Sequence, residues 1–189
     1  MLRTAAVLLG IGATVGSALD ALHTHGGVTS YPNPVAFKMA WWTPGIFGLA
    51  GLGTGLAYPL VESYLGKSIT APLTPQKVAV GMGVFTGLYA LTGFSRSKTA
   101  TKLAIVGAGA AALGLTLAPT REAALTALAA SVIGPIVEIN LVKRGLFTHH
   151  ESDWKGIPMW LPALYATGSI AFGVAGKWIH AELSRAEAK

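Results

Sequence analysis

The stretch WWTPGIFGLAGLGTGLAYP runs from Trp41 to Pro59 and contains five glycines. It lies within 23 consecutive uncharged residues between Lys38 and Glu62. About 20 apolar residues, at about 1.5 Å per residue in a helix, cross the hydrocarbon core of a bilayer. Tryptophan at one end and tyrosine at the other are residue types that gather at the two headgroup interfaces. The stretch therefore predicts a membrane-spanning helix.

Charged residues elsewhere are spaced so that five more apolar windows remain. The six predicted spans are approximately 4–22, 42–60, 78–95, 103–119, 123–142 and 157–179. The composition agrees, because 52% of the residues are hydrophobic and only 12% are charged, against about 25% charged in an ordinary soluble domain. We predict an all-α membrane protein in which a bundle of six transmembrane helices forms a single integral membrane domain over residues 1–189.

The N-terminus has two possible readings. Arg3 before an apolar run fits a secretory signal, but the run continues to Leu22, beyond the apolar core of about 7–15 residues that such signals have. A second predicted span follows directly, so we expect an uncleaved first span. The chain has no cysteine, which excludes disulfides and thiol chemistry.

The net charge of +6 does not indicate a nucleic-acid partner. The basic residues stand at the ends of the apolar windows, where Lys and Arg meet anionic headgroups, and no basic cluster is interleaved with aromatic residues. With six spans, seven basic residues fall on each side, so the positive-inside rule does not orient the chain.

Pairs of glycines four residues apart recur in three windows. Such pairs form a flat strip on one helix face and allow close approach of two helices in a bilayer. Some strips pack helices tightly and others line a groove of lipid size, and both interpretations remain open. The pairs are Gly12 with Gly16, Gly51 with Gly55, and Gly83 with Gly87.

Glu138 is the leading candidate for a binding residue. It lies inside the fifth window, three residues after Pro135, and a carboxylate at membrane depth usually faces a cavity or a partner inside the bundle. Pro135 is expected to kink the helix and expose local backbone polarity. The alternative is that Glu138 lies at headgroup level, near the end of its helix.

A second polar group lies at the end of the first span. Asp20 and His23 are three residues apart and share one helix face. We expect either a hydrated helix end or a polar patch that faces a ligand. The candidate ligand-binding residues are Glu138, Asp20, His23, Trp42, Gly51, Gly55 and Pro135.

The segment that contains His149, His150, Glu151 and Asp153 has metal-binding residue types. Adjacent histidines point in different directions on a regular backbone, and the spacing does not complete a zinc set. We therefore predict a solvated loop without a metal. No nucleophile elbow, phosphate loop or dinucleotide fingerprint is present, which gives no support for catalysis.

A group of residues in and around the second window forms a specific pattern: Ala40-Trp41-Trp42, Pro44, Gly48, Gly55-Leu56, Tyr58-Pro59, Ser63 and Leu65-Gly66. This pattern resembles the second span of the Insig family of sterol-responsive membrane proteins. The likeness extends to Val28-Thr29 and Tyr31-Pro32 after the first span, and to Asp153-Trp154, Ile157 and Trp160-Leu161-Pro162 before the last. It covers nearly the whole chain, although residues 66–118 match mostly in hydrophobicity.

The resemblance implies a non-enzymatic helical membrane protein that holds a lipid between its helices and associates with sterol-sensing-domain proteins. The family's acidic-basic pair after the fourth span appears here as Thr120-Arg121, without the acid, which argues against that partnership. The composition, rich in Ala and Gly, favours a prokaryotic cell membrane over the endoplasmic reticulum of a eukaryote.

We therefore expect a lipid-binding or lipid-sensing protein with a sterol or a diacylglycerol-like lipid in a cavity, no other cofactor, and a possible homo-oligomer. Two alternatives remain. One is a small transporter or channel, although spans one to three share no repeated motif with spans four to six. The other is a lipid-modifying enzyme that uses His149, His150 and Glu151.

Overall fold

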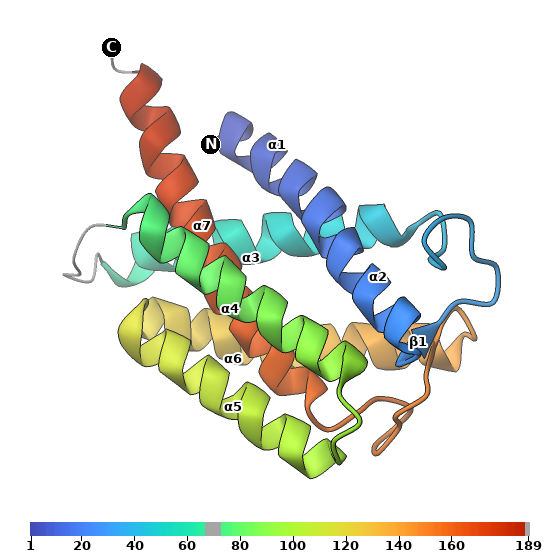
Figure 1. Cartoon of the computed structure of the whole chain (residues 1–189). Helices are drawn as coiled ribbons and strands as arrows, with labels where there is room; N and C mark the ends of the chain where they lie inside the picture. The colour runs from blue at the N-terminus through green and yellow to red at the C-terminus, as the bar shows by residue number, and fades with distance from the viewer. Residues whose placement is uncertain (67–72, 188–189) are drawn as a thin grey trace.

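The computed structural model describes residues 1–66 and 73–187, which form a bundle of helices (Figure 1). A continuous first helix comprises α1 (Leu2–Ile11), a π-helical turn η1 (Gly12–Gly16) and α2 (Ser17–Gly26). It is followed by α3 (Thr43–Leu65), α4 (Pro75–Phe94), α5 (Thr99–Thr116), α6 (Arg121–Lys143) and α7 (Leu161–Glu187). The prediction of an all-α bundle with six long helices is confirmed.

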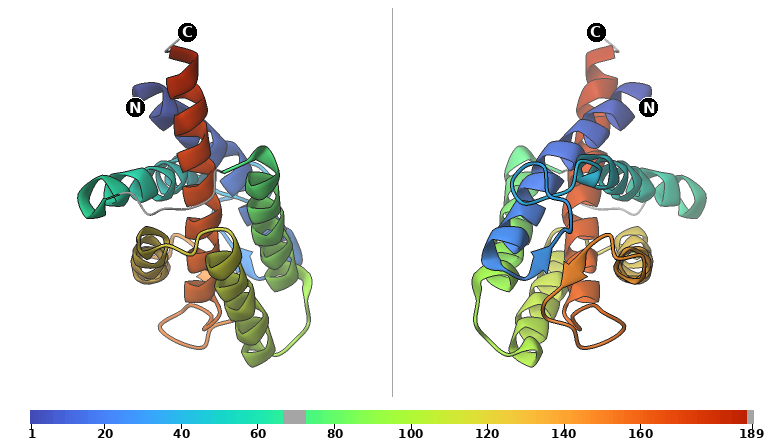
Figure 2. Two further views of the ribbon diagram at one scale, coloured as in Figure 1. Left: turned by 90° about the vertical axis from the view of Figure 1, so that its left-hand side faces the viewer. Right: turned by 90° about the vertical axis from the view of Figure 1, so that its right-hand side faces the viewer.

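Five of the helical segments are long and apolar enough to cross a membrane: Leu2–Gly26, Thr43–Leu65, Pro75–Phe94, Thr99–Thr116 and Arg121–Lys143. Within the described residues, α7 does not join this group, although residues 157–179 were predicted to span. The reason lies in its position. Helix α7 passes through the middle of the bundle and contacts α1, α3, α4, α5 and α6, as the two views in Figure 2 show.

A helix that is surrounded by protein needs less apolar surface than a helix that faces lipid. Every residue from Thr167 to Gly176 is buried, including the hydroxyls of Thr167 and Ser169. The C-terminal part of α7 extends beyond the bundle beside α1 (Figure 1). There Thr4 is hydrogen-bonded to His180, with 3.2 Å between Thr4 Oγ1 and His180 Nδ1.

Two of the three glycine pairs act in packing within this chain. Gly12 and Gly16 lie against Phe47 of α3, and Gly51 lies against the backbone of Gly12. Gly55 contacts Leu8 of α1 and also Gly176 of α7. Added side chains at these positions would collide with their neighbours, so the small residues set the distances between helices. By contrast, side-chain carbons at Gly83 and Gly87 would meet none of the described atoms within 4 Å.

A short antiparallel ribbon joins the two loops at one end of the bundle. Strands β1 (Thr29–Ser30) and β2 (Thr148–His149) pair Thr29 with His149 and Ser30 with Thr148. No pattern in the sequence predicted this ribbon. It brings the loop after the first helix against the loop after α6, although about 120 residues separate them in the chain.

An ion pair between a buried lysine and a partly exposed glutamate fixes the loops at the same end. Lys102 is fully buried, and its Nζ donates to the Thr92 carbonyl at 3.0 Å and to Glu151 Oε1 at 2.5 Å. The second oxygen of Glu151 accepts from Trp160 Nε1 at 3.1 Å. This network ties α5 to the end of α4 and to the segment that leads into α7.

Candidate functional site

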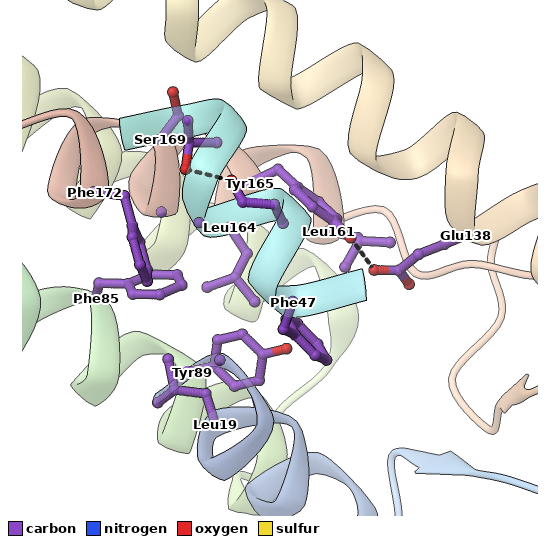
Figure 3. Close-up of a pocket in the computed structure, with 15 residues that line it drawn as sticks. Leu19, Phe47, Phe85, Tyr89, Glu138, Leu161, Leu164, Tyr165, Ser169 and Phe172 are labelled. Carbon is purple, nitrogen blue, oxygen red and sulfur yellow. Dashed lines mark hydrogen bonds between the residues drawn. The ribbon is translucent and has the colours of Figure 1, made fainter. Parts of the chain in front are cut away.

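The bundle encloses two adjoining cavities. The first, with about 600 Å³ of empty space including its mouth, lies between the first helix, α3, α4, α6 and α7. Figure 3 shows side chains from all these helices around it. Most of the lining residues are apolar, among them Leu19, Phe47, Phe85, Leu161, Leu164 and Phe172. Such a lining suits hydrocarbon better than polar groups.

The second cavity has about 580 Å³ of empty space including its mouth, and more of its lining is polar. It shares Phe47, Tyr89, Glu138 and Tyr165 with the first cavity. The ribbon of β1 and β2 supplies Thr29 and His149 to its wall. We call this space the polar chamber and the first space the apolar chamber.

Glu138 stands where the two chambers meet. Its Oε1 accepts a hydrogen bond from the Tyr165 hydroxyl at 2.5 Å, which Figure 3 marks with a dashed line. Its Oε2 lies 2.6 Å from His149 Nε2. An ionised carboxylate can only accept hydrogen bonds, so His149 Nε2 carries the proton in this pair. Tyr165 and His149 thus hold the Glu138 carboxylate in a fixed position in the cavity wall.

Asp20 forms a similar pair on the other side of the polar chamber. The Tyr31 hydroxyl donates to Asp20 Oδ2 at 2.8 Å. Burial, together with the neighbouring Asp20 carboxylate, raises the pKa of the Tyr31 hydroxyl well above its usual value. Tyr31, in the loop after α2, therefore remains a protonated donor that fixes the position of Asp20.

His23 is anchored by α4. Its Nε2 lies 2.9 Å from Thr92 Oγ1, and its ring stacks on Tyr89 with 4.1 Å between the ring centroids. Because the Thr92 hydroxyl donates to backbone carbonyls of its own helix, His23 Nε2 is the donor in their bond. His23 Nε2 is therefore already hydrogen-bonded within the protein. The imidazole ring forms part of the lining of the polar chamber.

Three residues that line the chambers have a buried side-chain polar atom without a hydrogen-bond partner among the described residues. The atoms are Thr29 Oγ1 and His149 Nδ1, on residues of the polar chamber, and Ser169 Oγ, on a residue of the apolar chamber. Buried polar atoms are nearly always paired, because an unpaired one costs about 1–3 kcal/mol. Each of these atoms has free hydrogen-bonding capacity for a polar group that reaches it.

The structure brings most of the candidate residues together. Glu138, Asp20, His23 and Trp42 line the polar chamber, and Gly51 lines the apolar chamber. The other two candidates, Gly55 and Pro135, line neither chamber. Gly55 packs against Leu8 and Gly176, and Pro135 is buried within α6, which continues through it.

The prediction of a solvated loop was wrong for His149. Its side chain is buried and bonded to Glu138, whereas His150 is exposed. Within the described part of the chain, no group of three or more His, Cys, Asp or Glu residues could hold a metal ion. Sequence reasoning also missed Tyr31 and Tyr165, which bind the two carboxylates. The only available signal was an uncharged polar side chain near an apolar window, which does not identify a partner.

Comparison with known proteins gives a consistent result, although no family model matches the chain. Insulin-induced gene 1 protein from Gallus gallus is 26% identical over 182 residues, which cover 94% of this chain and 72% of that protein. The protein of the same name from Homo sapiens is also 26% identical, with 94% of this chain and 65% of that protein covered. This chain therefore spans about two thirds of the human relative.

Solved structures extend the likeness to the fold. A mycobacterial Insig homolog, MvINS from Mycobacterium vanbaalenii, superposes with a TM-score of 0.82 at 25% identity and with 94% of each chain covered. The chain is an Insig homologue. A cross-linked trimer of a cysteine variant of MvINS superposes with a TM-score of 0.81 and the same coverage. This Insig homologue is accordingly an integral, multi-pass membrane protein.

Proposed function

We propose that this Insig homologue is a non-enzymatic membrane protein that binds a neutral lipid, a sterol or a diacylglycerol-like lipid, in the two adjoining chambers. The observation that carries the proposal is the junction at Glu138. There an apolar chamber continues into a polar chamber that contains unpartnered buried polar atoms. A lipid head would lie in the polar chamber and its hydrocarbon in the apolar chamber.

The charges in the polar chamber favour an uncharged head. Its described lining residues include the carboxylates of Asp20 and Glu138 but no lysine or arginine. A phosphate group would meet two acids without a cation to pair with, which is unfavourable in a partly desolvated site. Hydroxyl groups, in contrast, donate well to carboxylates. This supports sterols and acylglycerols over anionic phospholipids.

The volume open to water-sized groups is about 80 Å³ in the apolar chamber and about 60 Å³ in the polar chamber, below the about 300–1,000 Å³ of usual ligand pockets. Only part of a lipid therefore fits between the helices as they stand. A cavity that also opens at its mouth allows the end of a hydrocarbon chain to emerge among the membrane lipids. Bound lipid is then the only cofactor. The lipid is not chemically altered between binding and release.

The experiment is extraction of the purified protein followed by mass spectrometry of the lipids that remain bound. We expect a neutral lipid in near-stoichiometric amount with the wild type and about tenfold less with Glu138→Gln, because the substitution weakens the bonds that hold His149 and Tyr165 in the chamber wall, and a hydrogen bond to a charged group contributes about 1.5–3 kcal/mol. Glu182→Gln is the matched control, because Glu182 pairs with Arg185 on the exposed end of α7. Equal lipid in Glu138→Gln, or only detergent in the wild type, would overturn the proposal.

The same proposal includes location and assembly. The Ala- and Gly-rich, cysteine-free composition favours a prokaryotic cell membrane over an endoplasmic reticulum. The MvINS trimer supports a homo-oligomer, and membrane proteins with sterol-sensing domains remain a further candidate partner. Light scattering of the detergent-solubilised protein tests the assembly, and a single copy at all concentrations would contradict it.

A further inference from the structure

The two loop-and-helix units at the ends of the chain have the same backbone structure. Helix α3 begins at Thr43 and α7 begins at Leu161, which is 118 residues later. The helices that precede them end in the same way: Gly27 has φ 75° and Gly145, again 118 residues later, has φ 66°. After each of these glycines, the backbone N–H of the next residue donates to the carbonyl five residues earlier. The N···O distance is 2.9 Å from Val28 to His23 and 3.0 Å from Leu146 to Leu141.

The loops themselves repeat at the same spacing. A bridge joins Ala36 to Met39 in the first loop, and a bridge joins Trp154 to Ile157 in the second. Each turn is closed over residues with positive φ, 50° at Phe37 and 51° at its equivalent, Lys155. Such angles are costly for residues with side chains, so their recurrence at equivalent positions indicates one structural unit used twice.

The two units are related by an approximate two-fold axis. Ser30 pairs with Thr148, which is its own equivalent 118 residues later. An antiparallel pair of equivalent residues is what a two-fold axis through the ribbon produces. The crossing of α3 and α7 follows the same symmetry. Gly55 is equivalent to Gly173, and Tyr58 is equivalent to Gly176. The contact of Gly55 with Gly176 therefore has a symmetric counterpart, the contact of Gly173 with Tyr58, and both contacts are present.

The chambers lie between the two units and are lined by equivalent residues from each. In the polar chamber the equivalent pairs are Asp20 with Glu138, Tyr31 with His149, and Thr29 with Phe147. In the apolar chamber Phe47 and Tyr165 are equivalent, and both line its wall (Figure 3). The bond from Tyr31 to Asp20 therefore has a counterpart in the bond from His149 to Glu138.

We propose that Asp20 with Tyr31 and Glu138 with His149 are two half-sites of one polar clamp, which takes a lipid head with two hydroxyl groups, one at each half-site. The inference rests on the proposed function, because it specifies the head of the lipid held there. Both carboxylates line the polar chamber. A diol head that lies in this chamber would therefore be flanked by the two half-sites.

The half-sites differ in what they leave for the ligand. Among the described residues, Glu138 accepts from both Tyr165 and His149, whereas Asp20 accepts from Tyr31 alone. The cause is a single difference, since the equivalent of Tyr165 is Phe47. The Asp20 carboxylate accordingly accepts one ligand hydroxyl, and at the other half-site the unpartnered Nδ1 of His149 accepts the second.

The test compares two oleate esters, monoolein with two free hydroxyls and propylene glycol monooleate with one. Equilibrium binding to the intact purified protein in a fixed detergent gives the ratio of their affinities. We expect the wild type to prefer monoolein by about tenfold, which is the effect of one additional hydrogen bond to a charged or buried acceptor. Glu182→Gln is expected to keep this ratio.

Each half-site is then altered separately. Asp20→Asn and Glu138→Gln are each expected to reduce the ratio to near one, with binding of propylene glycol monooleate retained. Tyr31→Phe, which removes only a hydroxyl, provides a milder change at the first half-site if Asp20→Asn does not fold. It is expected to lower the ratio without loss of the helical circular dichroism signal.

The outcomes separate this inference from the proposed function. If Glu138→Gln removes the preference but both Asp20→Asn and Tyr31→Phe retain it, the head is held on one side only, and the clamp is refuted while lipid binding stands. A wild-type ratio near one also refutes the clamp. If neither probe binds and no lipid remains after purification, the proposed function itself fails.

Discussion

Replacement of Lys102 by methionine removes one partner of the buried ion pair that fixes the loop end of the bundle. The lysine side chain is fully buried, and the methionine side chain occupies a similar volume. Loss of one partner of a buried pair costs about 3–5 kcal/mol, because the remaining charge stays uncompensated. Here Glu151 is 32% exposed, so water screens part of its charge, and we expect a loss of about 2 kcal/mol.

For a chain of this length a loss of about 2 kcal/mol lowers the melting temperature by about 4–8 °C. Tryptophan fluorescence in one detergent follows the melt, since the chain has five tryptophans and Trp160 touches the pair through Glu151. Unfolding of a membrane protein is often irreversible, so all variants are compared at one heating rate. Lys98→Met, an exposed lysine one turn earlier, is the control and is expected to melt with the wild type.

The double variant Lys102→Met with Glu151→Gln decides whether charge is the cause. Once the lysine is absent, neutralisation of Glu151 removes the uncompensated charge, so the double variant is expected to regain about half of the lost stability. The reasoning is refuted if Lys102→Met melts within about 1 °C of the wild type. It is also refuted if the double variant is less stable than the single one.

Three further predictions use the same melting assay. Gly176→Ala places a carbon against the Gly55 backbone and is expected to lower the free energy of unfolding by about 1–3 kcal/mol. The control is Gly53→Ala, whose added carbon meets no described atom within 4 Å and which is expected to be neutral. Equal melting temperatures would contradict the close contact of α3 and α7. Lys38→Gly is expected to stabilise the protein by about 0.5–1 kcal/mol, because φ is 60° at this residue and glycine adopts this angle without strain. The greater freedom of glycine in the unfolded chain offsets part of the gain. A lower melting temperature would show that the lysine side chain makes a stabilising contact. Tyr58→Phe loses the hydroxyl that bonds to the threonine at the start of α6 at 2.6 Å, and we expect a loss of about 0.5–1.5 kcal/mol; an unchanged melting temperature would mean that water replaces this bond.

The acidic residues of the candidate site could be found from the sequence because a charge inside an apolar window is visible without a structure. Asp20 and Glu138 were predicted on that basis, and both line the polar chamber. Their partners could not be found in this way. Tyr31, His149 and Tyr165 reach the carboxylates through the β1–β2 ribbon and the crossing of α7, and these depend on contacts between distant segments.

The internal repeat was missed for a related reason. Comparison of the first three spans with the last three shows no shared motif, but the repeat relates the first two long helices to the last two and leaves α4 and α5 between them. Only Trp42 with Trp160 and Pro44 with Pro162 keep conspicuous identity near the helix starts. The similarity lies in backbone angles and hydrogen bonds, which several residue types can adopt.

The sequence by itself determined that the protein lies in a membrane and that it is helical. The spacing of charges leaves long apolar windows, and in a bilayer the backbone of such windows must form its hydrogen bonds internally. It also indicated where helices approach closely, through Gly12, Gly51 and Gly55. Only the tertiary structure decided that α7 is the central helix, and that the two carboxylates share one chamber. Both follow from the order in which the helices pack, which depends on the sum of many weak contacts between distant residues and not on any local pattern.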